Sequence, residues 1–286
     1  MRDGFLLVDK PADWTSHDVV AKVRNVVGIR KAGHAGTLDP MATGLLVIGL
    51  GRATRLLRFV QDLPKEYVAS VRFGVATTSG DADGEVIAEA PVEIDARRLD
   101  DVLASFVGTV DQIPPQVSAI KRGGKRLHEL ARAGIEIELE PRAVEVYAIE
   151  LSSFEPPDAT ITVRCGKGTY IRVLADDIAR ALGTRAHLTA LRRTASGSLG
   201  VDEAVTIPEL EAAADQEAVV LSAAEGLRDL AAVEVPPDQA SSVRHGAPVV
   251  GIAQPPGPVR LLDHGDLIGV YRSDGGNLVP EVVVVT

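Results

Sequence analysis

Strand-like and helix-like stretches follow one another along this chain without the regular alternation that a doubly wound parallel sheet requires. Apolar residues recur with a period of two in residues 67–73 and with a helical period in residues 16–27. A continuous apolar run at residues 45–50 is typical of a buried strand. Elements of these kinds in irregular order predict an α+β fold.

Capping residues and apolar spacing locate the individual elements. Thr15 or Ser16 can cap a helix that ends at Gly28, and Asp95 can cap another that carries Leu99 and other apolar residues on one face. We predict further helices over residues 52–60 and 172–182, and strands over residues 4–9, 45–50, 67–73, 144–154, 160–165 and 186–192.

The scarcity of aromatic residues and of cysteine limits both the core and the chemistry. Aromatic residues make up 3% of the chain, so Val, Leu, Ile and Ala must build the core. The single cysteine, Cys165, excludes an intramolecular disulfide and a zinc site made of several thiolates. No apolar run approaches the roughly 20 residues that span a bilayer, and the first residues lead directly into a strand pattern. We therefore expect a cytoplasmic protein.

Charge is distributed unevenly along the chain. The net charge of −10 is carried by residues 201–286, which hold 4 Lys and Arg against 14 Asp and Glu. Three stretches are basic, with net charges of +4, +4 and +5 in residues 1–60, 117–134 and 161–200. A phosphate backbone responds to the local field within roughly 8–10 Å. If these stretches meet in the fold, an acidic protein presents a positive surface to nucleic acid.

Two segments differ from the rest in organisation. Residues 112–142 contain paired prolines, paired glycines and several basic side chains with little periodicity, which indicates an insertion that stands off the core. Residues 203–231 are rich in Ala and Glu and predict a helical stretch. Residues 233–286 return to short strand-like runs, so we expect a main domain over residues 1–231 and a small β domain over residues 233–286.

The most informative stretch is residues 33–44, which read Gly-His-Ala-Gly-Thr-Leu-Asp-Pro-Met-Ala-Thr-Gly. It lacks the Gly-Lys-Ser/Thr of a P-loop and the glycine spacing of a dinucleotide fingerprint. On spacing alone, Asp39 followed by Pro40 among glycines favours a simple turn. A carboxylate in such a loop is also a candidate for acid–base or nucleophilic catalysis.

The literal string closely resembles the Gly-His-x-Gly-x-Leu-Asp-Pro-x-Ala-x-Gly motif of the bacterial tRNA pseudouridine-55 synthases, the TruB family. Five further stretches are similar to motifs of that family and follow in the same order: residues 9–11 with 14–17, 65–67, 78–84, 113–125, and 165–172 with 186–193. The resemblance covers residues 4–193.

The resemblance implies a pseudouridine synthase fold, in which helices flank a mixed, largely antiparallel central sheet. It also implies an inserted thumb loop at about residues 112–142 and a small C-terminal PUA-like domain. The implied reaction moves the glycosidic bond of the uridine at position 55 in the T loop of tRNA from C1′–N1 to C1′–C5. Such an enzyme uses no cofactor and no metal. It binds the T-arm of tRNA as a monomer, with no membrane and no obligatory protein partner.

The resemblance assigns catalytic roles to Asp39, Tyr67 and Arg172. Asp39 is the essential carboxylate, which could attack C1′, attack C6 or act on a sugar proton. Arg172 is its partner, since a guanidinium can fix the orientation of a carboxylate. Tyr67 can stack on uracil. Without the resemblance, the Tyr67 pattern favours a core aromatic and the Arg172 pattern a solvated arginine at a helix start.

The remaining predicted site residues bind substrate. His34 can fill the space that the extruded base leaves, and Leu191 closes the pocket on the side opposite Tyr67. Lys10 either contacts a phosphate or braces the pocket. The substrate-binding set is completed by Tyr170 and by the thumb cations Lys121, Arg122, Lys125 and Arg126.

The chain departs from the family pattern at three positions. Asp13 stands where the family commonly has Gly, Ala35 where it commonly has Thr, and His128 where the thumb usually has Tyr.

Two rival functions use the same basic residues. One is a non-catalytic RNA-folding protein that grips the tRNA elbow, and the other is a synthase of the same fold that acts on another RNA. The full set of Asp39, Tyr67 and Arg172 favours the enzyme, because binding alone needs no carboxylate beside phosphates.

Overall fold

The computed structural model describes residues 3–115, 121–122, 125–126, 140–252 and 257–284. Its strands are β1 (Gly4–Lys10), β2 (Ala32–His34), β3 (Thr43–Leu50), β4 (Lys65–Phe73), β5 (Val75–Thr77), β6 (Val86–Glu89), β7 (Gly108–Gln112), β8 (Lys121–Arg122), β9 (Lys125–Arg126), β10 (Arg142–Glu155), β11 (Asp158–Cys165), β12 (Ala186–Ser196), β13 (Leu199–Gly200), β14 (Val220–Leu221), β15 (Ala231–Glu234), β16 (Pro258–Asp263), β17 (Asp266–Asp274) and β18 (Asn277–Val283). Its helices are α1 (Ser16–Val27), η1 (Gly51–Arg55), α2 (Leu57–Gln61), α3 (Ala96–Ser105), α5 (Ile171–Ala181), η2 (Val201–Glu203), α6 (Ile207–Ala212), α7 (Ala223–Gly226) and α8 (Ala240–Arg244).

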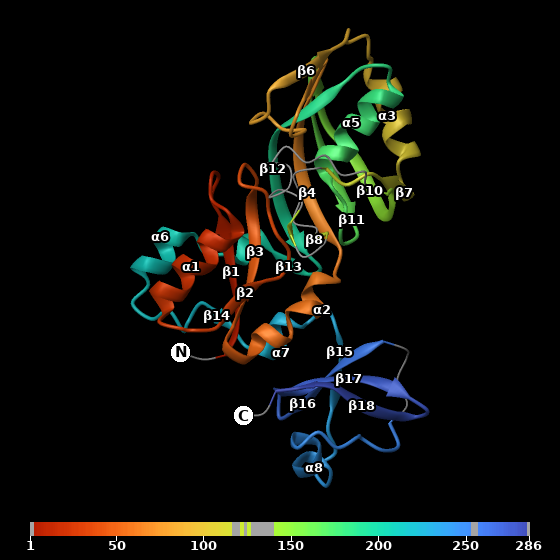
Figure 1. The fold of residues 1–286 in the computed structure, drawn as a ribbon. Coiled ribbons are helices and arrows are strands. Elements are labelled where there is room, and N and C mark those ends of the chain that lie inside the picture. Colours follow the sequence, from red (N-terminus) through yellow and green to blue (C-terminus); the bar gives the residue numbers. More distant parts are fainter. Residues whose placement is uncertain (1–2, 116–120, 123–124, 127–139, 253–256, 285–286) are drawn as a thin grey trace.

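The main sheet runs in the order β14-β1-β3-β12-β4-β11-β10-β7, with β2 paired to β3 and β13 paired to β12 (Figure 1). Its neighbouring strands are antiparallel except for β12 and β3, which pair in parallel where Arg192 lies opposite Thr43. The prediction of a mixed, largely antiparallel sheet flanked by helices is therefore confirmed.

Strands β1 and β3 are covered on both faces, which explains their continuous apolar sequences. Leu6 and Ile48 pack on one side with residues of α1, such as Val23. Phe5 and Val47 point the other way, into a second cluster that η1 and α2 complete. Because neither face is exposed to water, neither strand shows polar alternation.

In β4, β11 and β12, by contrast, apolar side chains cover one face and polar ones the other. Val71 of β4 and Ile161 of β11 pack with Leu174 and Ile178 of α5. Helix α3 adds Leu99 to the same cluster. Figure 1 shows both helices on this side of the sheet, so the alternating pattern marks which face they cover.

The C-terminal strands form a second sheet in the order β15-β16-β17-β18. Its residues Val270 and Val282 join the apolar cluster of η1 and α2, so the two sheets share a core there. Arg55 donates from Nη1 to the carbonyl oxygen of Val283 at 2.9 Å, and Arg58 pairs with Glu281 at 2.9 Å. The expected β-rich C-terminal region is confirmed, whereas the domain boundary near residue 232 stays a prediction.

Two predicted helical stretches differ from the observed structure. Residues 203–231 do not form a continuous helical stretch, because Thr206 and Ser222 each begin a separate short helix with a capping box. Strand β14 lies between those helices and pairs with β1 at the edge of the main sheet. Residues 52–60 are divided at Leu56 into η1 and α2. In residues 203–231, the pairing of β14 with β1 thus outweighs the helical preference of the local Ala and Glu residues.

The predicted insertion begins after β7 and ends at β10, two neighbouring antiparallel strands. Within it, β8 and β9 pair antiparallel, with Arg122 opposite Lys125. His128, where the family usually has Tyr, lies outside the described residues. Among the described residues, no helix is long and apolar enough to cross a membrane.

Candidate active site

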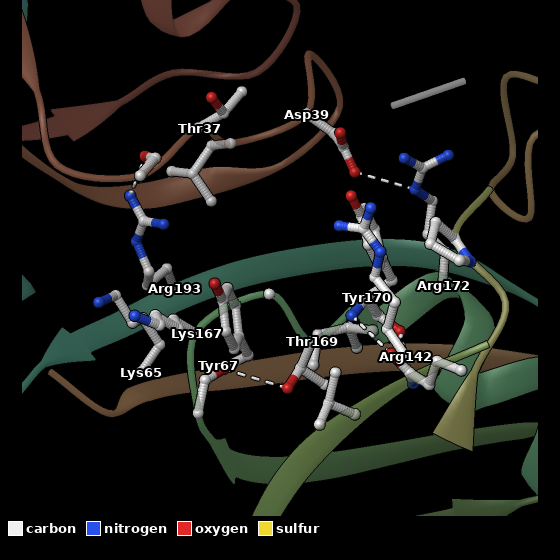
Figure 2. Close-up of a pocket in the computed structure, with 18 of the residues that line it drawn as sticks. Thr37, Asp39, Lys65, Tyr67, Arg142, Lys167, Thr169, Tyr170, Arg172 and Arg193 are labelled. Carbon is white, nitrogen blue, oxygen red and sulfur yellow. Dashed lines mark hydrogen bonds and ion pairs between the residues drawn. The ribbon is translucent and has the colours of Figure 1, made fainter. Parts of the chain in front are cut away.

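A cavity of about 630 Å³ opens on the helix-covered side of the main sheet, between the loop at residues 36–39 and the turn at residues 166–170 (Figure 2). Of the predicted site residues whose side chains the structure describes, it brings together five around this cavity, from four separate parts of the chain: Asp39, Tyr67, Tyr170, Arg172 and Leu191. A cavity of this volume can admit a planar base together with its sugar.

Asp39 and Arg172 form an ion pair at the wall of this cavity, with Nε of Arg172 2.9 Å from Oδ2 of Asp39. The Arg172 side chain is 4% exposed, whereas that of Asp39 is 37% exposed. The guanidinium is thus a fixed, buried cation, and the carboxylate that it orients still faces the cavity.

The loop that follows β5 holds Arg172 from behind. Nη1 of Arg172 donates to the carbonyl oxygen of Ser79 at 2.6 Å and lies 3.8 Å from Oδ2 of the buried Asp81. Gly80 adopts a φ of +76°, and a Cβ there would lie 3.3 Å from that of Arg172. The turn at residues 78–84 therefore needs glycine at position 80 to approach Arg172 closely. The motif at residues 78–84 includes this turn, but nothing in the sequence alone assigns Ser79 and Asp81 to the site.

Three buried polar side chains anchor the loop that carries Asp39. Ser16 accepts a hydrogen bond from the amide of Leu38 at 2.9 Å and donates to the carbonyl oxygen of Leu38 at 3.2 Å. Arg193 donates to the carbonyl oxygens of Leu45 and Gly36 at 2.7 and 3.1 Å. Both residues belong to motifs that the sequence displayed, yet their anchoring role became visible only in the fold.

Lys10 is the third anchor. Its ammonium donates to the carbonyl oxygens of Pro11, Trp14 and Pro40 at 2.8, 2.6 and 3.0 Å. The side chain is 0% exposed and does not line the cavity. Of the two roles that the sequence left open, the geometry is that of a brace for the peptide after Asp39, not of a phosphate contact.

Tyr67 lies on β4 directly opposite Arg193 of β12, and its phenol points into the cavity (Figure 2). Burial raises the pKa of the Tyr67 phenol, and the neighbouring Arg193 guanidinium opposes that rise. The phenol is therefore neutral near pH 7 and can donate a hydrogen bond.

Tyr170 is the N-cap residue of α5, two residues before Arg172 (Figure 2). Its backbone amide donates to Oε1 of Gln112 at 3.0 Å, and Nε2 of Gln112 donates back to its carbonyl oxygen at 3.3 Å. Gln112 is the last residue of β7, where the insertion begins. The base of the predicted thumb is thus tied to the helix that carries Arg172.

The structure does not place His34 among the residues that line the cavity. Its ring meets that of His17 edge to face, with the centroids 5.4 Å apart. Its carbonyl oxygen accepts from Nε2 of Gln61 at 3.4 Å. The side chains of Lys121, Arg122, Lys125 and Arg126 are outside what the structure describes, so their role stays a prediction.

Two departures from the family pattern have a visible setting. Asp13 has a φ of +65°, in the left-handed region that favours glycine and that aspartate tolerates better than most residues. Its amide donates to the carbonyl oxygen of Pro40 at 2.9 Å, beside Asp39. Ala35 is 1% exposed in the cluster under β3, and its amide donates to the carbonyl oxygen of Val47 at 2.9 Å.

Two buried ammonium groups predict an alkaline limit to activity. Lys10 and Lys65 each donate to three carbonyl oxygens, and burial lowers the pKa of each to about 8. Each is charged at pH 7 and loses one proton, and so one donor, as the pH rises through that value. We expect the single-turnover rate of the reaction in this cavity to fall above about pH 8. Lys10→Met should reduce that fall, because methionine has no proton to lose. A rate that stays constant up to about pH 9.5 would contradict the bracing role.

Comparison with known proteins identifies the family to which these motifs belong. The model of the TruB family pseudouridylate synthase N-terminal domain matches residues 24–171. The model of the tRNA pseudouridylate synthase B C-terminal domain matches residues 172–230, and that of the pseudouridine synthase II TruB C-terminal region matches residues 231–284.

Curated relatives match over nearly the whole length. The chain is 46% identical over 279 residues to the tRNA pseudouridine synthase B of Dechloromonas aromatica (strain RCB), a match that covers 97% of this chain and 93% of that protein. It is 43% identical over 286 residues to the tRNA pseudouridine synthase B of Azoarcus sp. (strain BH72), with 99% and 95% covered. Among solved structures, the crystal structure of a Cbf5-Nop10-Gar1 complex matches with a TM-score of 0.78 at 26% identity, over 98% of this chain and 84% of that chain.

Proposed function

This chain belongs to the TruB family of pseudouridine synthases, and from that membership we propose that it isomerises the uridine at position 55 in the T loop of tRNA. It is a tRNA pseudouridine synthase, an isomerase. The position of the target uridine, a monomeric state, action without an obligatory protein partner and a cytoplasmic location are all part of the proposal.

The observation that carries the catalytic assignment is the Asp39–Arg172 pair on a cavity that Tyr67 and Leu191 also line. We assign the essential step to the Asp39 carboxylate, which the buried guanidinium orients and the cavity leaves accessible. The uracil would lie between the Tyr67 ring and the Leu191 side chain. There the detached base can turn before C5 bonds to C1′.

Access to the cavity requires that the uridine leave its stacked position in the folded loop. The cavity has room for such an extruded nucleotide, and the exposed cations that line it, Arg142 and Lys167, suit the phosphates that accompany it. The tie between Tyr170 and Gln112 brings the start of the thumb beside this entrance. In this proposal the cavity positions the flipped base, and the neighbouring thumb binds the RNA backbone.

The rival functions fit the geometry less well. The Asp39 carboxylate is oriented by the buried Arg172, which Ser79 and Asp81 hold in place. A protein that only binds RNA has no use for such an arrangement. The matched chain of the Cbf5-Nop10-Gar1 complex is 26% identical to this chain. The tRNA synthases are 46% and 43% identical to it over nearly their whole lengths, which favours tRNA.

The direct test is to incubate the purified protein with an unmodified tRNA transcript and to map pseudouridine by chemical labelling. We expect one modified position, 55, and no reaction with a transcript that carries cytidine there. Modification at another position would overturn the assigned target, and absence of pseudouridine would overturn the proposed enzyme.

The thumb cations should bind phosphates, not bases. Replacing Lys125 and Arg126 by Ala should therefore make the negative slope of log K, where K is the RNA association constant, against log[salt] shallower. We expect its magnitude to fall by about 0.7–0.9 for each phosphate that is no longer neutralised. Arg97→Ala is a suitable control, because that exposed arginine lies on α3 and does not line the cavity. If the slope is the same in all variants, the RNA is bound elsewhere on the protein.

A further inference from the structure

One ion pair lies at the mouth of the cavity and has no part in the catalytic assignment. Nζ of Lys167 lies 2.7 Å from Oδ1 of Asp62, and the two side chains are 69% and 61% exposed. Both residues line the same cavity as Asp39. Asp62 follows α2 directly, and Lys167 lies in the turn after β11. The pair therefore links two walls of the entrance.

Lys167 differs from the buried cations of the cavity. Lys65, Arg172 and Arg193 are each at most 5% exposed and donate to backbone carbonyl oxygens. These three are committed to the fold. Lys167 instead presents its ammonium to water, with the exposed carboxylate of Asp62 as its partner. Such an exposed pair is weak and readily exchanged for a stronger anion.

The backbone on both sides of the pair is held independently of it. The amide of Gly166 donates to the carbonyl oxygen of Glu145 at 2.8 Å, and Oγ1 of Thr169 donates to the carbonyl oxygen of Gly166 at 3.1 Å. On the other wall, Lys65 binds the carbonyl oxygens of Val60, Gln61 and Leu63 at the end of α2. Opening the pair thus needs only side-chain rotation.

We propose that Asp62 competes with a phosphate of the substrate for the ammonium of Lys167. When RNA enters the cavity, that phosphate displaces Asp62 from Lys167. The inference rests on the proposed function, since it takes the ligand to be the backbone of a polynucleotide. In the free protein Asp62 holds the ammonium that a phosphate needs, and in the complex the released carboxylate repels that phosphate. Asp62 therefore weakens RNA binding and speeds release of the modified RNA, without acting on the chemical step.

Single-turnover kinetics over a range of enzyme concentrations separate binding from chemistry, because the half-saturating concentration reports the first and the saturating rate the second. With an unmodified tRNA transcript, we expect Asp62→Asn to lower the half-saturating concentration by about three- to tenfold and to leave the saturating rate unchanged. Lys167→Gln should raise the half-saturating concentration by a similar factor.

The double variant tests whether the two residues act on each other. In the Lys167→Gln background, Asp62→Asn should have at most a small effect, because there is no ammonium left to release. An undiminished effect would mean that Asp62 acts only through its general negative charge. Weaker binding by Asp62→Asn would mean that the pair shapes the entrance. Either outcome overturns the proposal.

A matched control is Asp158→Asn. Asp158 also pairs with a cation, Arg72, at 2.8 Å and at 46% exposure, but it does not line this cavity. Its replacement should change neither kinetic parameter. The proposed function fails separately, since the wild-type protein would then form no pseudouridine at position 55.

Discussion

Asp39→Asn is expected to reduce pseudouridine formation below detection, while the affinity for tRNA changes by less than about tenfold, or roughly 1.4 kcal/mol. The amide keeps the volume of the carboxylate but removes its charge and its nucleophilic oxygen. Binding should persist because the groups proposed to bind RNA lie on the thumb and at the cavity mouth. Single-turnover assays and a direct binding measurement give the two quantities.

The fold of this variant should be preserved. Arg172 retains the carbonyl oxygen of Ser79 and the carboxylate of Asp81, so its buried charge does not lose all of its partners. An unchanged thermal unfolding transition is the control. Substantial residual turnover in a protein folded like the wild type would remove Asp39 from the catalytic role.

Arg172→Lys is expected to lower the single-turnover rate by at least about a hundredfold, close to 2.7 kcal/mol, with little change in binding. The guanidinium reaches Asp39 through Nε while Nη1 binds Ser79 and approaches Asp81. A lysine carries its donors on a single nitrogen, so it cannot reproduce the planar fork in which Nε faces Asp39 and Nη1 faces Ser79. The carboxylate would keep a cation nearby but lose its fixed orientation.

Arg180→Lys is the matched control for this change. Arg180 lies on the same helix and also pairs with an aspartate, Asp176, at 2.9 Å, but its side chain is 60% exposed and lies outside the cavity. Its replacement should leave the rate unchanged. If Arg172→Lys instead weakened binding and spared the saturating rate, Arg172 would be a phosphate clamp and the assigned pair would be wrong.

Local sequence determined most of the helices and strands of the main domain. The helix from Ser16 to Val27 begins at the Thr15 capping box and ends at Gly28, whose φ is +64°, as its residue types predict. The alternation in residues 67–73 predicted a strand, and β4 confirms it. The stretch at residues 203–231 was predicted wrongly, because pairing of β14 with β1 and two further capping boxes divide it.

The sequence by itself also determined which residue types could do the chemistry, because a motif conveys the identity of Asp39, Tyr67 and Arg172. What it could not convey is which groups meet. The contact of Arg172 with Asp39 depends on how α5 packs on the sheet, and the burial of Lys10 depends on the distant loop that carries Pro40. A lysine is the same in sequence whether its ammonium faces a phosphate or three carbonyl oxygens. Only the tertiary structure decides that, because burial and hydrogen-bond partners come from residues distant in the chain.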